Sequence, residues 1–279
     1  MLRTLEYNDI ENASLEIDYL TSHWFKNFLE KHGEEIVSLN IKRVSFNISY
    51  NEVTSALKIL KEYKFKHNAF DKNILIIFIT SVTSPVDVDI NNFLIINISD
   101  CIIKSDNCYN LIPLKDETIS RIKKALSNNI NIILDPVIDL DNISEFNNIL
   151  DKIWVLDRDI NIFLNGYLIP TSLMKEHPCN AYLCNGWYCK RNICSLPRVL
   201  YLNKRNYLYP HRIIDDRVII GKLDKSLIDC LNRYKSSEQF ELFINICKRV
   251  FIKYLRNYPY GLIPFVAYLN KELCEYDNK

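Results

Sequence analysis

The hydrophobic positions at the start of the chain indicate one helix followed by a β–α pair. Over residues 14–32 the apolar side chains recur at roughly helical spacing and Gly33 follows as a stop signal, so we expect an N-terminal helix. In residues 36–49 apolar and polar side chains alternate, as in a strand with one buried face. Residues 50–65 then place their apolar side chains on one helical face.

Strand and helix patterns continue to alternate as far as about residue 170. Short, continuous β-branched runs predict strands that are covered on both faces. Because parallel neighbours need crossover connections, we predict the α/β class, built as a partial (β/α) barrel or as an open parallel sheet. Periodicity does not decide between a closed and an open sheet. The strand patterns occupy residues 73–81, 92–99, 130–140 and 160–169, and the helical patterns occupy residues 115–129 and 141–153.

The pattern changes near residue 170, where sustained periodicity gives way to clustered cysteines. Beyond them, residues 198–213 predict a hairpin, residues 216–234 a short strand and a helix, and residues 236–258 an amphipathic helix. We therefore divide the chain into two domains. Residues 1–172 form a barrel-like domain with an N-terminal helix, and residues 173–279 form a cysteine-rich tail that ends in helices.

Composition narrows the possible partners. A hydrophobic fraction of 48% in 279 residues is enough for a substantial core, and 35 Lys and Arg against 34 Asp and Glu leave no basic surface for nucleic acid. The N-terminal residues carry acids where a secretory signal has an apolar run, and no uncharged segment approaches the roughly 20 residues that span a bilayer. We expect a cytoplasmic protein without nucleic-acid or membrane partners. The five glycines form no phosphate-binding loop.

Four evenly spaced cysteines are the strongest chemical signal in the chain. In "CNAYLCNGWYCKRNIC" each of Cys179, Cys184, Cys189 and Cys194 is separated from the next by four residues. Neither a helix nor a strand would aim all four thiols at one point, so we expect a folded-back loop. Because cytosolic thiols stay reduced, metal ligation is favoured over disulfides or a local core of cysteines.

Zinc and an iron–sulfur cluster both fit four soft sulfur ligands, and the spacing does not choose between them. His177 and His211 could replace one or two of the sulfurs. The predicted metal ligands are Cys179, Cys184, Cys189, Cys194 and His211. The other cysteines (Cys101, Cys108, Cys230, Cys247 and Cys274) are interpreted as inert residues, of which Cys247 and Cys230 lie on apolar helix faces.

Two stretches of the tail and one of the barrel resemble the radical SAM enzymes that carry a C-terminal SPASM or twitch domain. "VLYLNKRNYLYPHRI" and "VIIGKLDKSLIDCL" resemble the hairpin and the following helix of that domain. "ISRIKKALSNNINIILDPVIDLDNISEFNNILDKI" resembles a late helix, strand and helix of the family's partial barrel. The resemblance covers roughly residues 40–230 and implies a partial (β/α) barrel with a SPASM- or twitch-like tail.

The chain departs from that family at two places. The CxxxCxxC motif, which holds the cluster that cleaves S-adenosylmethionine, is absent from the N-terminal half, where only Cys101 and Cys108 occur. At the hairpin, His211 stands where the family has a cysteine. The chain therefore resembles a degenerate, pseudo-radical-SAM protein, which is not expected to cleave S-adenosylmethionine. The resemblance implies a role in ribosomal-peptide maturation, through binding of a precursor peptide or of a peptide-modifying enzyme.

Two alternatives remain open, a zinc-stabilised interaction domain and an α/β enzyme whose reaction the sequence does not identify. Carboxylates of such an enzyme could be Asp135 and residues 139–141, which follow a buried strand. The same residues serve equally well as a turn and a helix N-cap, so no catalytic or cofactor-binding residue is assigned. The loop at residues 80–89 is interpreted as structural.

Overall fold

A computed structural model describes most of the chain. The described residues are 13–86, 89–135, 148–149, 151–153, 155, 160–164, 167–170, 188–189, 192–193, 199–210, 213–250, 252–253 and 265–276. In chain order, the first half holds β1 (Ala13–Leu20), α1 (Ser22–Ser38), β2 (Ile41–Ile48), α2 (Tyr50–Lys66), α3 (Asn68–Asn73), β3 (Leu75–Thr80), β4 (Phe93–Asn97), β5 (Cys108–Pro113), η2 (Asp116–Thr118), α4 (Ile119–Ser127) and β6 (Ile132–Asp135). The second half holds β7 (Asn161–Leu164), β8 (Tyr167–Pro170), β9 (Tyr188–Cys189), β10 (Asn192–Ile193), β11 (Val199–Leu202), β12 (Tyr207–Pro210), η5 (Asp216–Val218), β13 (Gly221–Lys222), α7 (Leu227–Lys235), α8 (Glu238–Val250) and α9 (Phe265–Tyr276).

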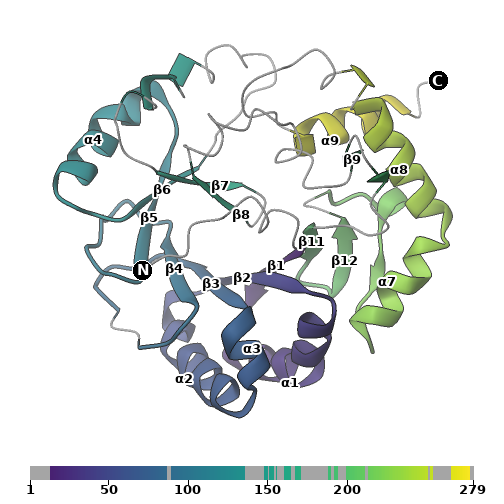
Figure 1. Ribbon diagram of the computed structural model, residues 1–279, viewed down its shortest axis with the longest axis horizontal. Helices are drawn as coiled ribbons and strands as arrows, with labels where there is room; N and C mark the ends of the chain where they lie inside the picture. Colours follow the sequence, from purple (N-terminus) through teal and green to yellow (C-terminus); the bar gives the residue numbers. More distant parts are fainter. Residues whose placement is uncertain are drawn as a thin grey trace.

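One 11-stranded, mostly parallel sheet organises the fold, which confirms the predicted α/β class. Its order is β13-β12-β11-β1-β2-β3-β4-β5-β6-β7-β8, and every pair from β11 to β7 is parallel. The sheet curves strongly, and helices lie on its outer side (Figure 1). Its edges are antiparallel, with β12 and β13 at one end and β8 at the other.

The second half of the chain returns to the first strand. β11 pairs in parallel with β1, so that Ser14 lies opposite Val199 and Glu16 lies opposite Tyr201. Strands on both sides of residue 172 therefore belong to one sheet. The proposed boundary at that residue stays a prediction about domains, but any site on β1 and β11 draws on both halves of the chain.

The expected N-terminal helix over residues 14–32 is wrong in its first third. Residues 13–20 form β1, which pairs with β2 on one side and β11 on the other. The helix begins only at Ser22, after Thr21 caps it by accepting a hydrogen bond from the Trp24 amide. The alternation of Leu15 and Ile17 with polar neighbours has the strand period of two, and pairing on both sides favours that period.

Gly33 does not end the first helix, which continues to Ser38. A Cβ at Gly33 would overlap the Tyr63 hydroxyl and lie 2.7 Å from the ring carbon that carries it. The glycine therefore marks the place where α1 packs closely against α2. The strand expected at residues 160–169 is also corrected, because it is two antiparallel strands, β7 and β8.

The two faces of the sheet differ in polarity. On the outer face, residues such as Leu15, Phe46 and Phe78 form one core with α1, α2, α3 and α7. On the inner face, β3, β4 and β6 contribute a smaller apolar cluster that includes Ile77 and Ile96. The inner positions of β1 and β2 are instead polar and buried: Ser14, Glu16, Arg43 and Ser45.

A carboxylate joins α1 to the start of α7. Glu35 accepts hydrogen bonds from the Ser226 hydroxyl, from the Leu227 amide at 2.9 Å and from the ring nitrogen of buried His32 at 2.8 Å. Ser226 is itself the N-cap of α7 and accepts from the Asp229 amide at 3.2 Å. Glu35 thus satisfies donors at a helix start, where backbone amides lack intrahelical partners.

Candidate functional site

Four of the five predicted metal ligands lie outside the described residues, namely Cys179, Cys184, Cys194 and His211. The backbone of the fifth, Cys189, lies in β9, which pairs antiparallel with β10 so that Cys189 is opposite Asn192. The chain therefore reverses direction within the cysteine array. In the part of the chain that the structure describes, no group of three or more His, Cys, Asp or Glu side chains could hold a metal ion. Metal ligation by the array stays a prediction.

The remaining sequence candidates divide between the core and the surface. Cys230 and Cys247 are buried as expected, Cys108 is also buried, and Cys101 and Cys274 are exposed. Asp135 is half-buried at the end of β6, and residues 139–141 lie outside the described part of the chain.

The loop at residues 80–89 is held by a buried polar network in its described residues. The Asn97 side chain accepts from the Val82 amide at 2.9 Å and donates to Asn110 at 3.1 Å. This network supports the structural interpretation of the loop.

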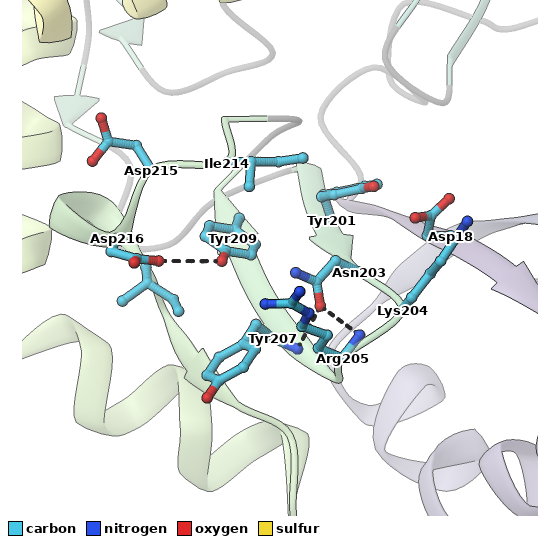
Figure 2. Close-up of a pocket in the computed structure, with 11 residues that line it drawn as sticks. Asp18, Tyr201, Asn203, Lys204, Arg205, Tyr207, Tyr209, Ile214, Asp215 and Asp216 are labelled. Carbon is cyan, nitrogen blue, oxygen red and sulfur yellow. Dashed lines mark hydrogen bonds between the residues drawn. The ribbon is translucent and has the colours of Figure 1, made fainter.

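The inner face of the sheet holds a cavity of about 930 Å³ beside the β11–β12 hairpin (Figure 2). Its size is in the range of small-molecule binding pockets. Its described lining comes from β1, from the hairpin and from the segment around η5. The lining residues are Asp18, Tyr201, Asn203, Lys204, Arg205, Tyr207, Tyr209, Ile214, Asp215, Asp216 and Ile219.

Strand register explains why three tyrosines meet on the floor of this cavity. Tyr201 lies directly opposite Tyr209 in the β11–β12 ladder, and Tyr207 lies two residues before Tyr209 in β12, on the same face. The intervening Leu208 points to the outer face and joins the main core. Because side chains alternate along a strand, burying Leu208 outside turns the tyrosines inward. Tyr201 also lies opposite Glu16 of β1, so the floor continues toward the polar positions of β1.

Asn203 fixes the tip of the hairpin. Its side-chain oxygen accepts from the Arg205 amide at 2.9 Å and from the Tyr207 amide at 3.0 Å, as Figure 2 shows. Asn206 completes the turn with a φ of 63°, a left-handed conformation that Asn tolerates better than most residues. Lys204 and Arg205 are exposed at this tip.

The short η5 segment forms the wall of the cavity that faces the hairpin tip. Asp215 caps it by accepting from the Arg217 amide at 2.9 Å and also binds the Arg217 guanidinium through two nitrogens, at 3.0 and 2.7 Å. The Tyr234 hydroxyl of α7 donates to the Val218 carbonyl at 3.2 Å and anchors the segment from behind. The wall is therefore rigidly connected to the helical layer.

The two carboxylates of the η5 segment have different partners. The Arg217 guanidinium beside Asp215 holds the pKa of that carboxyl below its usual range. Burial raises the pKa of Tyr209, and the neighbouring Asp216 raises it further. Tyr209 is therefore a neutral phenol at physiological pH, and its hydroxyl lies 3.5 Å from an Asp216 carboxylate oxygen.

This lining is suited to recognition. It offers aromatic surface, an amide, carboxylates and cations, whereas none of its described members is Ser, Cys or His. Tyrosines give large and rigid contact area at low entropic cost, and the charged groups at the rim favour some ligands over others.

The sequence did not identify this site, although one signal was present. Tyr207 and Tyr209 are two residues apart in a predicted hairpin, which already places them on one face. Asp18 could not be found in the same way, because its segment was interpreted as a helix. The sequence also does not show which face of the hairpin α7 covers, and therefore which face is left to line a cavity.

The described helices include none that is long and apolar enough to cross a membrane. No protein-family model, curated protein or solved structure matches this chain.

Proposed function

We propose that this protein is a non-catalytic partner in the maturation of a ribosomally made peptide, and that the cavity beside the β11–β12 hairpin binds a segment of the precursor peptide. The observation that carries this proposal is the floor of Tyr201, Tyr207 and Tyr209 in a cavity of about 930 Å³. Tyrosine is enriched among the few pocket-bound residues that carry most of the affinity in protein–protein interfaces.

The position of the cavity supports the same function. Its lining spans Asp18 near the carboxyl end of β1 and the hairpin tip at residues 204–205, which adjoins the carboxyl end of β11. In α/β folds with parallel strands, ligands bind at this edge. The absence of CxxxCxxC from the sequence favours binding over cleavage of S-adenosylmethionine.

The tail adds a second part to the proposal. We place a zinc ion or an iron–sulfur cluster on Cys179, Cys184, Cys189 and Cys194, with His211 as a further ligand, in a SPASM- or twitch-like tail. The reversal of the chain between β9 and β10 supports a loop that gathers these thiols. The metal ion or cluster would stabilise the fold of the tail.

A random-peptide selection tests the binding function without knowledge of the natural peptide. We would select linear dodecapeptides from a display library on the immobilised full chain, and measure fluorescein-labelled winners by fluorescence polarisation. Tyr207→Ala should weaken binding at least about tenfold, because it removes an aromatic anchor that is half-buried in the cavity.

Tyr276→Ala is the matched control, since Tyr276 is a tyrosine on α9, 37% exposed, and does not line the cavity. It should leave the affinity unchanged. If no selected peptide depends on Tyr207, or if both variants weaken binding equally, the cavity is not a peptide site.

A further inference from the structure

The cavity has a positive end and a negative end. Arg205 is exposed at the hairpin tip and carries the positive charge of this end, whereas Lys204 next to it and Asp18 of β1 carry opposite charges. At the other end Asp216 is exposed on η5, where the Tyr209 hydroxyl is its hydrogen-bond partner among the described residues. Asp215 adds little to the negative end, because Arg217 binds it with two nitrogens.

Tyr209 lies between these two ends, and its titration responds to both of them. Burial raises the pKa of Tyr209, Asp216 raises it further, and Arg205 lowers it. Opposite effects on one hydroxyl mean that it experiences both charges. A ligand that lies across Tyr209 would therefore meet a carboxylate on one side and a guanidinium on the other, as the close-up in Figure 2 illustrates.

The two charges come from two different segments. Arg205 lies in the turn between β11 and β12, whereas Asp216 lies in η5, with a carboxylate oxygen 3.5 Å from the Tyr209 hydroxyl. Side chains of one peptide segment that crosses Tyr209 would therefore meet opposite charges.

We infer that the cavity selects a peptide segment that places a basic side chain at Asp216 and an acidic side chain at Arg205. Tyr201, Tyr207 and Tyr209 then contact the residues between them. This inference rests on the proposed peptide-binding function and adds the charge pattern of the bound segment. Complementary charges fix the register and reject the opposite arrangement, because like charges would face each other.

The test exchanges the two charges of the protein. We would prepare the double variant Arg205→Glu with Asp216→Arg, which keeps the net charge, and repeat the dodecapeptide selection on it. The wild type should enrich peptides that carry a basic and an acidic residue in one fixed order and spacing, and the double variant should enrich the exchanged order.

Two labelled probes make the comparison quantitative. One is a peptide selected on the wild type, and the other is the same peptide with its basic and acidic residues exchanged. The wild type should prefer the first probe about tenfold and the double variant the second, since each mismatch replaces attraction by repulsion at both ends.

The control is Lys26→Glu with Glu30→Lys, which exchanges an exposed ion pair on α1 whose two residues do not line the cavity. It should keep the wild-type preference. A further measurement uses the unaltered protein, whose affinity for the first probe should fall when NaCl is raised from 50 to 500 mM, because salt screens exposed charges.

The outcomes separate the two proposals. This inference would be overturned, and the binding function kept, if the selected peptides need Tyr207 but show no charge pattern. The same holds if the double variant does not reverse the preference, or if the affinity does not depend on salt. A selection that yields no peptide dependent on Tyr207 would overturn both.

Discussion

Glu35 offers the sharpest test of how the two halves of the chain are held together. Its carboxylate receives hydrogen bonds from His32 of its own helix and from Ser226 and Leu227 at the start of α7. Because a carboxylate only accepts, the Nδ1 atom of His32 carries the proton, and the ring is a donor. Glu35→Ala would leave the Leu227 amide and the His32 ring without this acceptor.

The expected loss can be worked from these contacts. A hydrogen bond to a charged group contributes about 1.5–3 kcal/mol when it is well shielded. Three donors are involved, but the Glu35 side chain is 19% exposed, so water replaces part of the interaction. We therefore expect Glu35→Ala to lower the free energy of unfolding by about 3 kcal/mol. In a chain of this size that corresponds to a fall in Tm of about 6–10 °C.

Thermal unfolding followed by circular dichroism at pH 7 measures this loss. Glu34→Ala is the matched control, because it removes the same charge from an exposed neighbouring residue of α1. It should change Tm by no more than about 2 °C. A Glu35→Ala protein that melts at the same temperature as the control would show that the Glu35 hydrogen bonds do not stabilise the fold.

The same contacts predict how the loss depends on pH. Burial raises the pKa of Glu35, but the hydrogen bonds from His32, Ser226 and Leu227 outweigh it and hold the pKa below the usual value of 4.5. The stabilisation is therefore complete above pH 4.5 and disappears as the pH falls through the lowered pKa of the folded state. The difference in stability between wild type and Glu35→Ala should be largest near neutral pH and shrink below pH 4.5.

Three further predictions concern other parts of the fold. Gly33→Ala should lower stability by about 1–2 kcal/mol in urea unfolding, because the added methyl group overlaps Tyr63 although alanine favours the helix; an unchanged or raised midpoint would contradict it. Asn97→Ala should cost about 2–4 kcal/mol in the same assay, since it removes a fully buried side chain that joins the ends of two strands to their loops, and wild-type stability would show that the network is dispensable. Replacing Cys184 and Cys189 by serine should release zinc or bleach absorbance near 400 nm after anaerobic purification; an unchanged metal content, measured by plasma mass spectrometry, would show that the array does not bind the metal.

Local sequence patterns predicted the secondary structure correctly where the pattern fits only one type of element. The β-branched runs at β3 and β4 and the hairpin of β11 and β12 were predicted close to their observed bounds. Their signals are strong because burial on both faces, or a polar turn between two runs, fits few other structures. Gly33 failed as a stop signal because its lack of a side chain serves the packing of α1 on α2 rather than a helix end.

The candidate site was less accessible to sequence reasoning. Asp18 lines the cavity only because residues 13–20 form the strand β1. Apolar side chains at positions 15 and 17 are compatible with a helix or a strand, and pairing with β2 and β11 selects the strand. Asp216 of η5 and Arg205 of the hairpin turn line one cavity, whose floor depends on the register that places Tyr201 opposite Tyr209. Register depends on backbone pairing, which no single segment encodes.

The α/β class, the alternation of strands and helices and the reversal at the hairpin can be predicted from the amino-acid sequence, because they follow from local periodicity and turn chemistry. The sequence also set the four cysteine positions that define the predicted metal site. The tertiary structure decided that β11 lies beside β1, which inner positions stay uncovered by helices, and hence where a cavity with two charged ends forms. Those features depend on contacts between residues nearly 200 positions apart, whose free energy is gained only when the whole sheet assembles.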